Sequence, residues 1–173
     1  MKILICYHSQ SGNTEKVARA MQESLEFEDV TACPIADVDP TSLKDYDLVI
    51  IGSGVYAGSV GPTIKSLLKQ ATDLPPRFAL FMTHANPDPG MWQNAFKPIR
   101  RTIEKAGSKV VGEFECLGEN TVVPKDVLER VYSLESLPPE ECEAAHARVE
   151  ATIGHPDDGD LVNAREFAKS MLG

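Results

Sequence analysis

The sequence predicts a doubly wound α/β fold, in which one five-stranded parallel sheet lies between two layers of helices. Short apolar runs alternate with amphipathic helical patterns along most of the chain. This alternation is typical of a parallel sheet covered on both faces, and right-handed crossovers between its strands give three layers. The 173 residues fit a single domain, 1–173, that can bury a core without disulfides or metal ions.

Five apolar runs of strand length supply the sheet, and four amphipathic segments supply the helices. The expected strands are 2–7, 30–35, 47–52, 77–83 and 109–117, and the expected helices are 14–25, 62–71, 92–106 and 157–172. Pro62 suits the first position of the second helix, and Gly107 is expected to end the third.

Residues 118–155 interrupt this alternation between the fifth strand and the last helix. They contain an apolar stretch at 127–132, the pair Pro138-Pro139 and a helical pattern that ends near Ile153. The segment is too short to own a core, so we interpret it as a helical insertion within the domain. We expect its helix to pack against the domain's own edge; a dimer contact or a wall over a ligand are the alternatives.

The net charge of −9 argues against nucleic acid and anionic membranes as main partners, because both require a positive surface. No apolar run is long enough to span a bilayer, and the N-terminus lacks the long apolar region of a secretory signal. A cytoplasmic location is therefore expected. The four cysteines lie far apart and form no close metal-binding pair, so no metal site is expected.

The loop between the first strand and the first helix carries the clearest chemical signal. It reads Ser9-Gln10-Ser11-Gly12-Asn13-Thr14, and ligands of open parallel sheets bind beyond the carboxyl ends of the strands. Hydroxyl groups and free backbone N–H groups at a helix N-terminus bind phosphate, and Gly12 allows close approach of the backbone. A plain helix N-cap is the alternative, since serine, asparagine and threonine all cap helices.

Other known phosphate sites would lack an essential residue here. A P-loop requires Gly-Lys-Ser/Thr and a dinucleotide site requires GxGxxG, and the loop has neither. A phosphatase loop that starts at Cys6 would need arginine where Gly12 stands. A phosphoacceptor receiver domain would need an aspartate at the end of the third strand, where Gly52 and Ser53 stand.

The pattern Ser9-x-Ser11-Gly12-x-Thr14 resembles the phosphate loop T/S-x-T/S-G-x-T of the flavodoxin family. The segment 52–58 resembles the second loop of that family, which packs on the isoalloxazine ring, and 83–92 stands where the third loop should be. The resemblance covers residues 1–117 and the last helix. It implies FMN as the cofactor and the sheet order 2-1-3-4-5. The insertion and the third loop depart from typical small flavodoxins, which leaves the partner open.

The resemblance implies a set of FMN contacts from these three loops. They are Ser9, Gln10, Ser11, Gly12, Asn13, Thr14, Ser53, Gly54, Val55, Tyr56, Ala57, Gly58, Thr83, His84, Ala85, Asn86 and Trp92. Tyr56 is expected to stack on the ring, because an isoalloxazine needs flat aromatic or apolar cover. Trp92 covers the other face or anchors the helix that begins there, and His84 contacts the flavin or is a polar edge residue. No catalytic acid, base or nucleophile is expected.

We expect an electron carrier that cycles FMN between the oxidised, semiquinone and hydroquinone states. Its acidic surface suits basic reductase or acceptor proteins as redox partners. The alternative is an FMN-dependent oxidoreductase that acts on a quinone, a porphyrin-type molecule or another small substrate. A third interpretation is a doubly wound module without flavin. The oligomeric state is left open.

Overall fold

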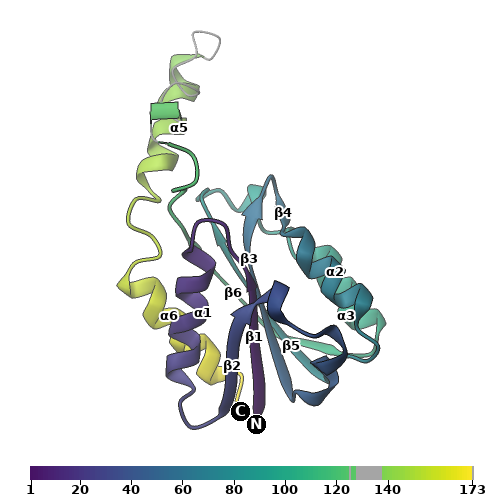
Figure 1. Cartoon of the computed structure of the whole chain (residues 1–173). Coiled ribbons are helices and arrows are strands. Elements are labelled where there is room, and N and C mark those ends of the chain that lie inside the picture. Colours follow the sequence, from purple (N-terminus) through teal and green to yellow (C-terminus); the bar gives the residue numbers. More distant parts are fainter. Residues whose placement is uncertain (125, 128–137, 173) are drawn as a thin grey trace.

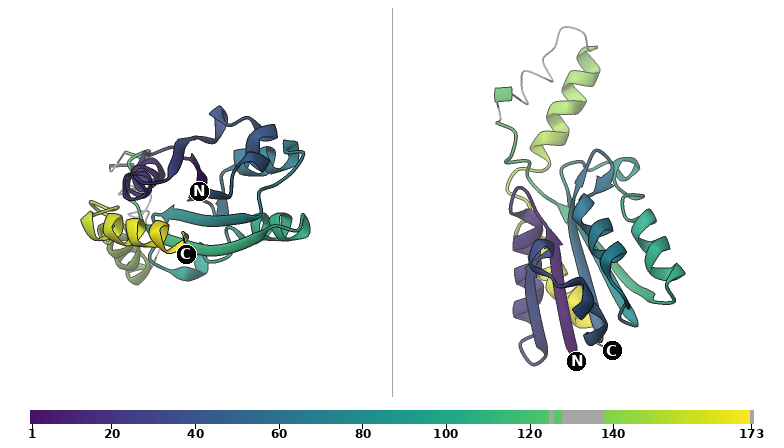
Figure 2. Two further views of the ribbon diagram at one scale, coloured as in Figure 1. Left: turned by 90° about the horizontal axis from the view of Figure 1, so that it is seen from below. Right: turned by 45° about the vertical axis from the view of Figure 1, so that its right-hand side comes forward.

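The structure is a computed structural model that describes residues 1–124, 126–127 and 138–172. Its sheet lies between two pairs of helices, as Figures 1 and 2 show. One face is covered by α1 (Asn13–Ser24) and α6 (Asp158–Ser170), and the other by α2 (Pro62–Gln70) and α3 (Lys97–Lys105). This is the predicted three-layer architecture.

Five parallel strands form the sheet, in the order β2-β1-β3-β5-β6. They are β1 (Lys2–His8), β2 (Asp29–Pro34), β3 (Leu48–Tyr56), β5 (Arg77–His84) and β6 (Lys109–Leu117). Counted along the chain, these five follow the order 2-1-3-4-5, which confirms the prediction. A short sixth strand, β4 (Ser59–Val60), pairs antiparallel with the end of β3 and has no counterpart in the prediction.

The core consists of two clusters, one on each face of the sheet. Successive side chains of a strand point to opposite faces. Ile3, Ile5 and Tyr7 of β1 therefore pack with α1 and α6, whereas Leu4 and Cys6 pack with α2 and α3. Short 3-10 helices lie in the connections, at Ile35–Asp37, Pro40–Asp45 and Pro89–Met91. Both faces of β1 are buried, which explains its continuous apolar run.

The third strand is longer than predicted. The sequence analysis ended it at Gly52, but β3 continues to Tyr56. Gly52 pairs with Phe81 of β5, and a Cβ on Gly52 would lie 2.0 Å from the Phe81 ring. Glycine at this position makes room for the neighbouring aromatic ring within the sheet, so it does not mark the start of a loop.

The third helix is shorter than predicted. A helix over 92–106 was expected from Trp92 onward, but α3 begins only at Lys97. A 3-10 turn over Pro89–Met91 precedes it, capped by the Asp88 side chain. Pro98 lies in the first turn of α3, where proline is tolerated because no intrahelical N–H bond is lost there. That proline is the sequence signal for the true start.

The described part of the insertion differs from the expected packing. Helix α5 (Pro139–Glu150) extends away from the sheet and from the other helices in Figures 1 and 2. Ala145 is buried and Cys142 and Val149 are half-buried, while most other side chains described on α5 are exposed. The expectation of a helix packed against the domain's own edge is therefore wrong for this segment. Of the predicted stretch 127–132, all but Val127 lies outside the described residues.

Candidate functional site

A pocket opens at the carboxyl ends of β1, β3, β5 and β6, where the sheet order reverses direction along the chain. Its cavity has a volume of about 240 Å³. The lining residues are Gln10, Ser11, Asn13, Gly54, Val55, Tyr56, Thr83, His84, Ala85, Gly118, Glu119, Asn120, Val122 and Val123. Lysine and arginine are absent from this lining as far as the structure describes the chain.

The first wall is the phosphate loop, residues 9–14, together with the start of α1. Gly12 has a φ of +88°, and a Cβ there would meet no atom within 4 Å. Backbone conformation, not space, therefore requires glycine. No side chain caps α1; the Ser9 hydroxyl instead accepts a hydrogen bond from the Gly12 N–H at 3.1 Å. Within the described part of the chain, the first N–H groups of α1 have neither an intrahelical partner nor a side-chain cap, which contradicts the plain N-cap interpretation.

Two hydroxyl residues of the predicted site lie beneath the pocket. Thr14 is 1% exposed, and its hydroxyl lies 2.9 Å from the hydroxyl of Thr83 on β5. Ser53 is fully buried; its hydroxyl donates to the carbonyl of Gly54 and accepts from the N–H of Gly61. The Thr14–Thr83 bond ties the start of α1 to the sheet, and the Gly61–Ser53 bond ties the connection between β4 and α2 to β3, so both residues support the pocket without lining it.

The second wall is a β-hairpin. Its turn is Ala57 and Gly58, whose φ angles are 47° and 75°. A two-residue hairpin turn with two positive φ angles is type I′, so most of 52–58 is strand and only its tip is a turn. Tyr56 lines the pocket and contacts His8 edge-on, with 5.5 Å between ring centroids. Burial raises the pKa of Tyr56, although the N–H of Gln10 opposes this shift. The phenol is thus neutral at physiological pH.

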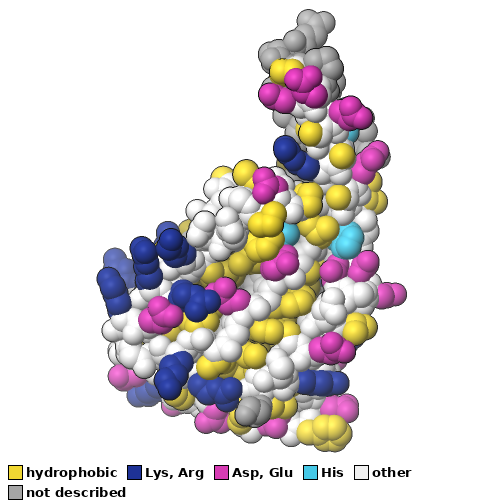
Figure 3. Space-filling view, turned by 180° about the vertical axis from the view of Figure 1, so that it is seen from behind, with side chains coloured by type: hydrophobic (Ala, Val, Ile, Leu, Met, Phe, Trp, Pro, Cys, Tyr) yellow, Lys and Arg dark blue, Asp and Glu magenta, His cyan; other side chains and the backbone are white. Residues whose placement is uncertain are grey.

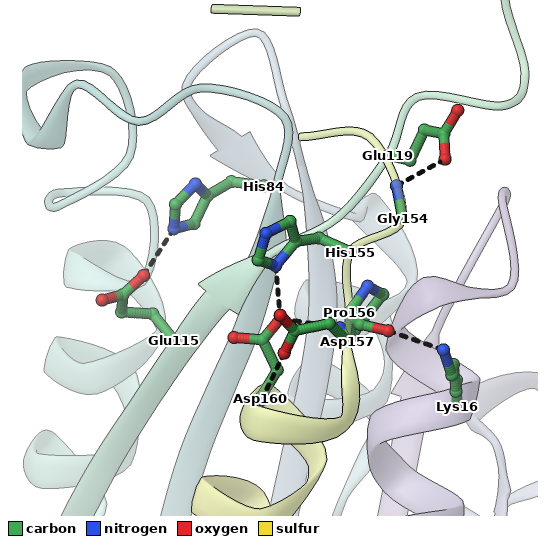
Figure 4. A network of polar contacts seen from close by, with 9 residues as sticks. All are labelled: Lys16, His84, Glu115, Glu119, Gly154, His155, Pro156, Asp157 and Asp160. Carbon is green, nitrogen blue, oxygen red and sulfur yellow. Dashed lines mark hydrogen bonds and ion pairs between the residues drawn. The ribbon is translucent and has the colours of Figure 1, made fainter. Parts of the chain in front are cut away.

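The third wall is organised by His84 at the end of β5. Its Nδ1 lies 2.9 Å from the carbonyl oxygen of Asn86, and its Nε2 lies 2.6 Å from a carboxylate oxygen of Glu115 on β6 (Figure 4). Trp92 stacks on the imidazole, with 4.4 Å between centroids and 13° between planes. Trp92 therefore anchors the segment before α3 through His84 and does not line the pocket.

The structure brings about half of the predicted contact residues to the pocket surface. Those that line it are Gln10, Ser11, Asn13, Gly54, Val55, Tyr56, Thr83, His84 and Ala85. The others belong to the same loops without lining the cavity: Ser9, Gly12, Thr14, Ser53, Ala57, Gly58, Asn86 and Trp92. Contact of either group with FMN stays a prediction.

A fourth wall, residues 118–123, comes from the insertion, for which a wall over a ligand was the alternative expectation, but none of its residues was predicted to belong to the site. Five of its residues line the pocket. Its position depends on contacts with residues that are far away in the sequence. The Asn13 side-chain amide donates to the carbonyl of Glu119 at 2.7 Å, and the Glu119 N–H donates to the carbonyl of His155 at 2.8 Å. Asn13 and Glu119 are 106 positions apart, so no local pattern signals this wall.

Both ends of the insertion are fixed near the phosphate loop, although α5 extends away from it. The N–H of Gly154 donates to the Glu119 carboxylate at 2.9 Å, and the Lys16 ammonium donates to the carbonyl of Pro156 at 2.6 Å (Figure 4). The fourth wall is therefore attached to Asn13, at the start of α1. The end of the insertion is attached to Lys16, one turn further along α1.

One cluster near the insertion has metal-ligand side chains. His155, Asp157 and Asp160 place ligand atoms within 4.8 Å of one another. The same atoms form the N-terminal cap of α6, in which Asp157 and Asp160 make a capping box and His155 Nδ1 bonds the Asp160 carboxylate at 2.6 Å. The N–H of Asp160 holds the pKa of Asp157 below its usual value. Helix capping accounts for this cluster, and we assign no metal to it.

A family model described as a flavodoxin domain matches residues 4–169 of the chain. The chain belongs to the flavodoxin domain family. Two relatives match over almost the whole chain. An uncharacterized protein of Methanocaldococcus jannaschii is 28% identical over 174 residues, 99% of each chain. The flavodoxin-like domain-containing protein BilS of Clostridioides difficile is 25% identical over 181 residues, 99% of this chain and 97% of its own.

Solved structures share the flavodoxin fold with this family member. A flavodoxin from the domain Archaea aligns with a TM-score of 0.57 and 16% identity over all of both chains. The oxidised flavodoxin 1 of Bacillus cereus aligns with a TM-score of 0.58 and 16% identity, covering 90% of this chain and 99% of its own. A flavoprotein of Lactobacillus acidophilus, solved in complex with FMN, aligns with a TM-score of 0.51 and 24% identity, covering 66% and 92%. In the described ranges, no helix has both the length and the apolar character needed to span a membrane.

Proposed function

We propose that the protein binds FMN non-covalently and carries electrons between redox partners. The observation that carries this proposal is the phosphate loop. The N-terminus of α1 meets the pocket without a side-chain cap, and none of the described residues that line the cavity is a lysine or an arginine. A dianionic phosphate would be held there by backbone N–H groups, hydroxyls and the positive end of the helix dipole. Membership of the flavodoxin family supports the same choice of cofactor.

The other walls fit the flat ring of the cofactor. Tyr56 and Val55 offer aromatic and apolar cover, and Thr83 to Ala85 offer backbone groups for the polar edge of the ring. FMN, when bound, supplies reversible transfer of one or two electrons. The chain's own residues bind the phosphate, orient the ring and limit the access of water to it.

The size of the pocket supports electron transfer to a partner. Its volume of about 240 Å³ lies below the roughly 300 Å³ at which pockets begin to enclose most of a ligand. One edge of the ring would then stay accessible to a docked protein. Electron transfer requires the partner protein to approach the ring closely, but it does not require a cavity for a substrate.

The acidic surface supports a basic partner. The net charge is −9, and Figure 3 shows Asp and Glu side chains along the projecting α5. Glu140, Glu141, Glu143 and Glu150 of this helix are exposed. Such a surface attracts a basic reductase or acceptor protein and raises the rate of encounter.

A second function is favoured by the fourth wall. Val122 and Val123 place apolar groups in the same pocket as Tyr56, and both come from the insertion. A small flat substrate such as a quinone or a porphyrin-type molecule would find apolar cover there. In this case the protein would be an FMN-dependent oxidoreductase.

The deciding experiment is an absorbance spectrum of the purified protein followed by stepwise reduction. We expect a yellow protein with bound FMN that accepts electrons one at a time and passes them to an added electron-transfer protein. Turnover of NAD(P)H with a small quinone, without a protein acceptor, would favour the oxidoreductase. A colourless protein that binds no added FMN would contradict both functions.

A further inference from the structure

His84 is the buried titratable side chain of the pocket. It is 5% exposed, and both of its ring nitrogens are engaged. Nδ1 faces the carbonyl oxygen of Asn86, and Nε2 faces the carboxylate of Glu115. The indole of Trp92 lies parallel to the ring on one side.

The two partners determine which nitrogens carry hydrogen. A backbone carbonyl and a carboxylate accept hydrogen bonds and have none to donate. A neutral imidazole has one N–H and can satisfy only one of them, whereas an imidazolium donates to both. The stacked contact with the face of the Trp92 indole also favours a positively charged His84 ring.

The resulting ion pair is oriented relative to the pocket. The side chain of His84 is 4% exposed and that of Glu115 is 45% exposed, so the positive end lies inward and the negative end faces solvent. On the same strand as Glu115, Glu113 forms an ion pair with Arg100 of α3. Among the described residues of the lining there is no lysine or arginine, so a protonated His84 would be the cationic group of this pocket in a chain whose net charge is −9.

We propose that His84 carries a proton on both ring nitrogens and places a positive charge in the pocket wall, where it favours reduced FMN over oxidised FMN. This inference rests on the proposed function. Uptake of two electrons and one proton leaves one negative charge on the flavin ring, and a nearby cation stabilises that charge. His84 transfers no proton in this role; it sets the relative affinity of the two redox states.

The test combines two variants with two measurements. Affinities for oxidised FMN and for dithionite-reduced FMN are measured by titration of the flavin-free protein. In His84→Gln we expect oxidised FMN to bind within about twofold of the natural protein and reduced FMN to bind about tenfold more weakly, a typical coupling between two sites. Nitrogen NMR of the flavin-free natural protein at pH 7 should show hydrogen on both His84 nitrogens.

The double variant His84→Gln/Glu115→Gln separates charge from packing. It removes both charges, so the affinity for reduced FMN should return to within about threefold of the natural value. Arg165→Gln breaks an exposed ion pair with Glu23 outside the pocket lining and should leave the ratio of affinities unchanged.

The outcomes of this test are distinct. Equal weakening of both redox states in His84→Gln, or no recovery in the double variant, would overturn the inference and assign His84 a packing role. Hydrogen on only one nitrogen would also overturn it. Failure of the natural protein to bind FMN in either redox state would instead overturn the proposed function, and this inference with it.

Discussion

The phosphate loop and the walls opposite it are held in place by different kinds of contact. Within the loop, the Gly12 N–H bonds the Ser9 hydroxyl three positions away. In the opposite walls, His84 bonds Glu115 across 31 positions and Asn13 bonds Glu119 across 106. The internal shape of the loop should therefore depend on local backbone geometry. Its attachment to the sheet through Thr14 and Thr83, and the positions of the opposite walls, should depend on tertiary contacts. Variants of Thr14, Gly12, Asn13 and Ala57 distinguish these two kinds of support.

The largest effect is expected where the loop is tied to the sheet. Thr14→Val keeps the shape of the side chain but leaves the buried Thr83 hydroxyl without its partner. An unsatisfied buried hydroxyl costs about 2 kcal/mol of unfolding free energy. Thr14→Ser retains the hydroxyl and is the matched control, with a smaller loss. Denaturant unfolding of both variants measures the difference, and a loss in Thr14→Val no larger than that in Thr14→Ser would show that the pair of hydroxyls does not stabilise the loop.

A smaller loss is expected at the left-handed glycine of the loop. Gly12→Ala forces alanine to a φ of +88°, which costs about 1 to 2 kcal/mol. Gly107 has a φ of +90° and equally open space, so Gly107→Ala is a matched control away from the pocket. Both variants should lose similar stability, but only Gly12→Ala should weaken FMN binding. If both variants bind FMN more weakly, the affinity follows the global stability of the protein and not the geometry of the loop.

The contact between the loop and the fourth wall should contribute less. Asn13→Ala removes the hydrogen bond to the carbonyl of Glu119, worth about 1 kcal/mol. Asn163→Ala on the exposed face of α6 provides a control with little expected effect. Hydrogen exchange of residues 118–123 should accelerate in Asn13→Ala and stay unchanged in Asn163→Ala. Unchanged hydrogen exchange in both variants would show that this bond does not hold residues 118–123 in place.

The smallest effect is a gain at the hairpin turn. Ala57 has a φ of 47°, a conformation that asparagine tolerates better than alanine. Ala57→Asn creates the Asn-Gly pair that type I′ turns prefer, and we expect about 0.5 to 1 kcal/mol of added stability. Ala57→Val should be destabilising, because a β-branched residue is poorly suited to this conformation. Thermal unfolding that ranks the variants in the opposite order would contradict the turn assignment.

The difference between local and long-range contacts also explains which features of the molecule could be predicted from the sequence. Continuous apolar runs such as that of β1 gave the sheet and its order, because a strand buried on both faces has few polar residues. The loop 9–14 could be recognised as a candidate phosphate site because its residues are adjacent in the sequence. Gly52 misled the prediction, since its role depends on the ring of Phe81 on another strand. Glu115 and Glu119 were missed because their partners are fixed only by the folded sheet.

The measurement that tests the account most directly compares FMN with riboflavin, which lacks the phosphate, in titrations of the flavin-free protein. In the proposed complex, hydroxyls and the uncapped N–H groups of α1 bind the phosphate. Each hydrogen bond to a charged group contributes about 1.5 to 3 kcal/mol, so FMN should bind at least tenfold more tightly than riboflavin. Equal affinity for the two ligands, or binding of neither, would contradict the phosphate site at the N-terminus of α1.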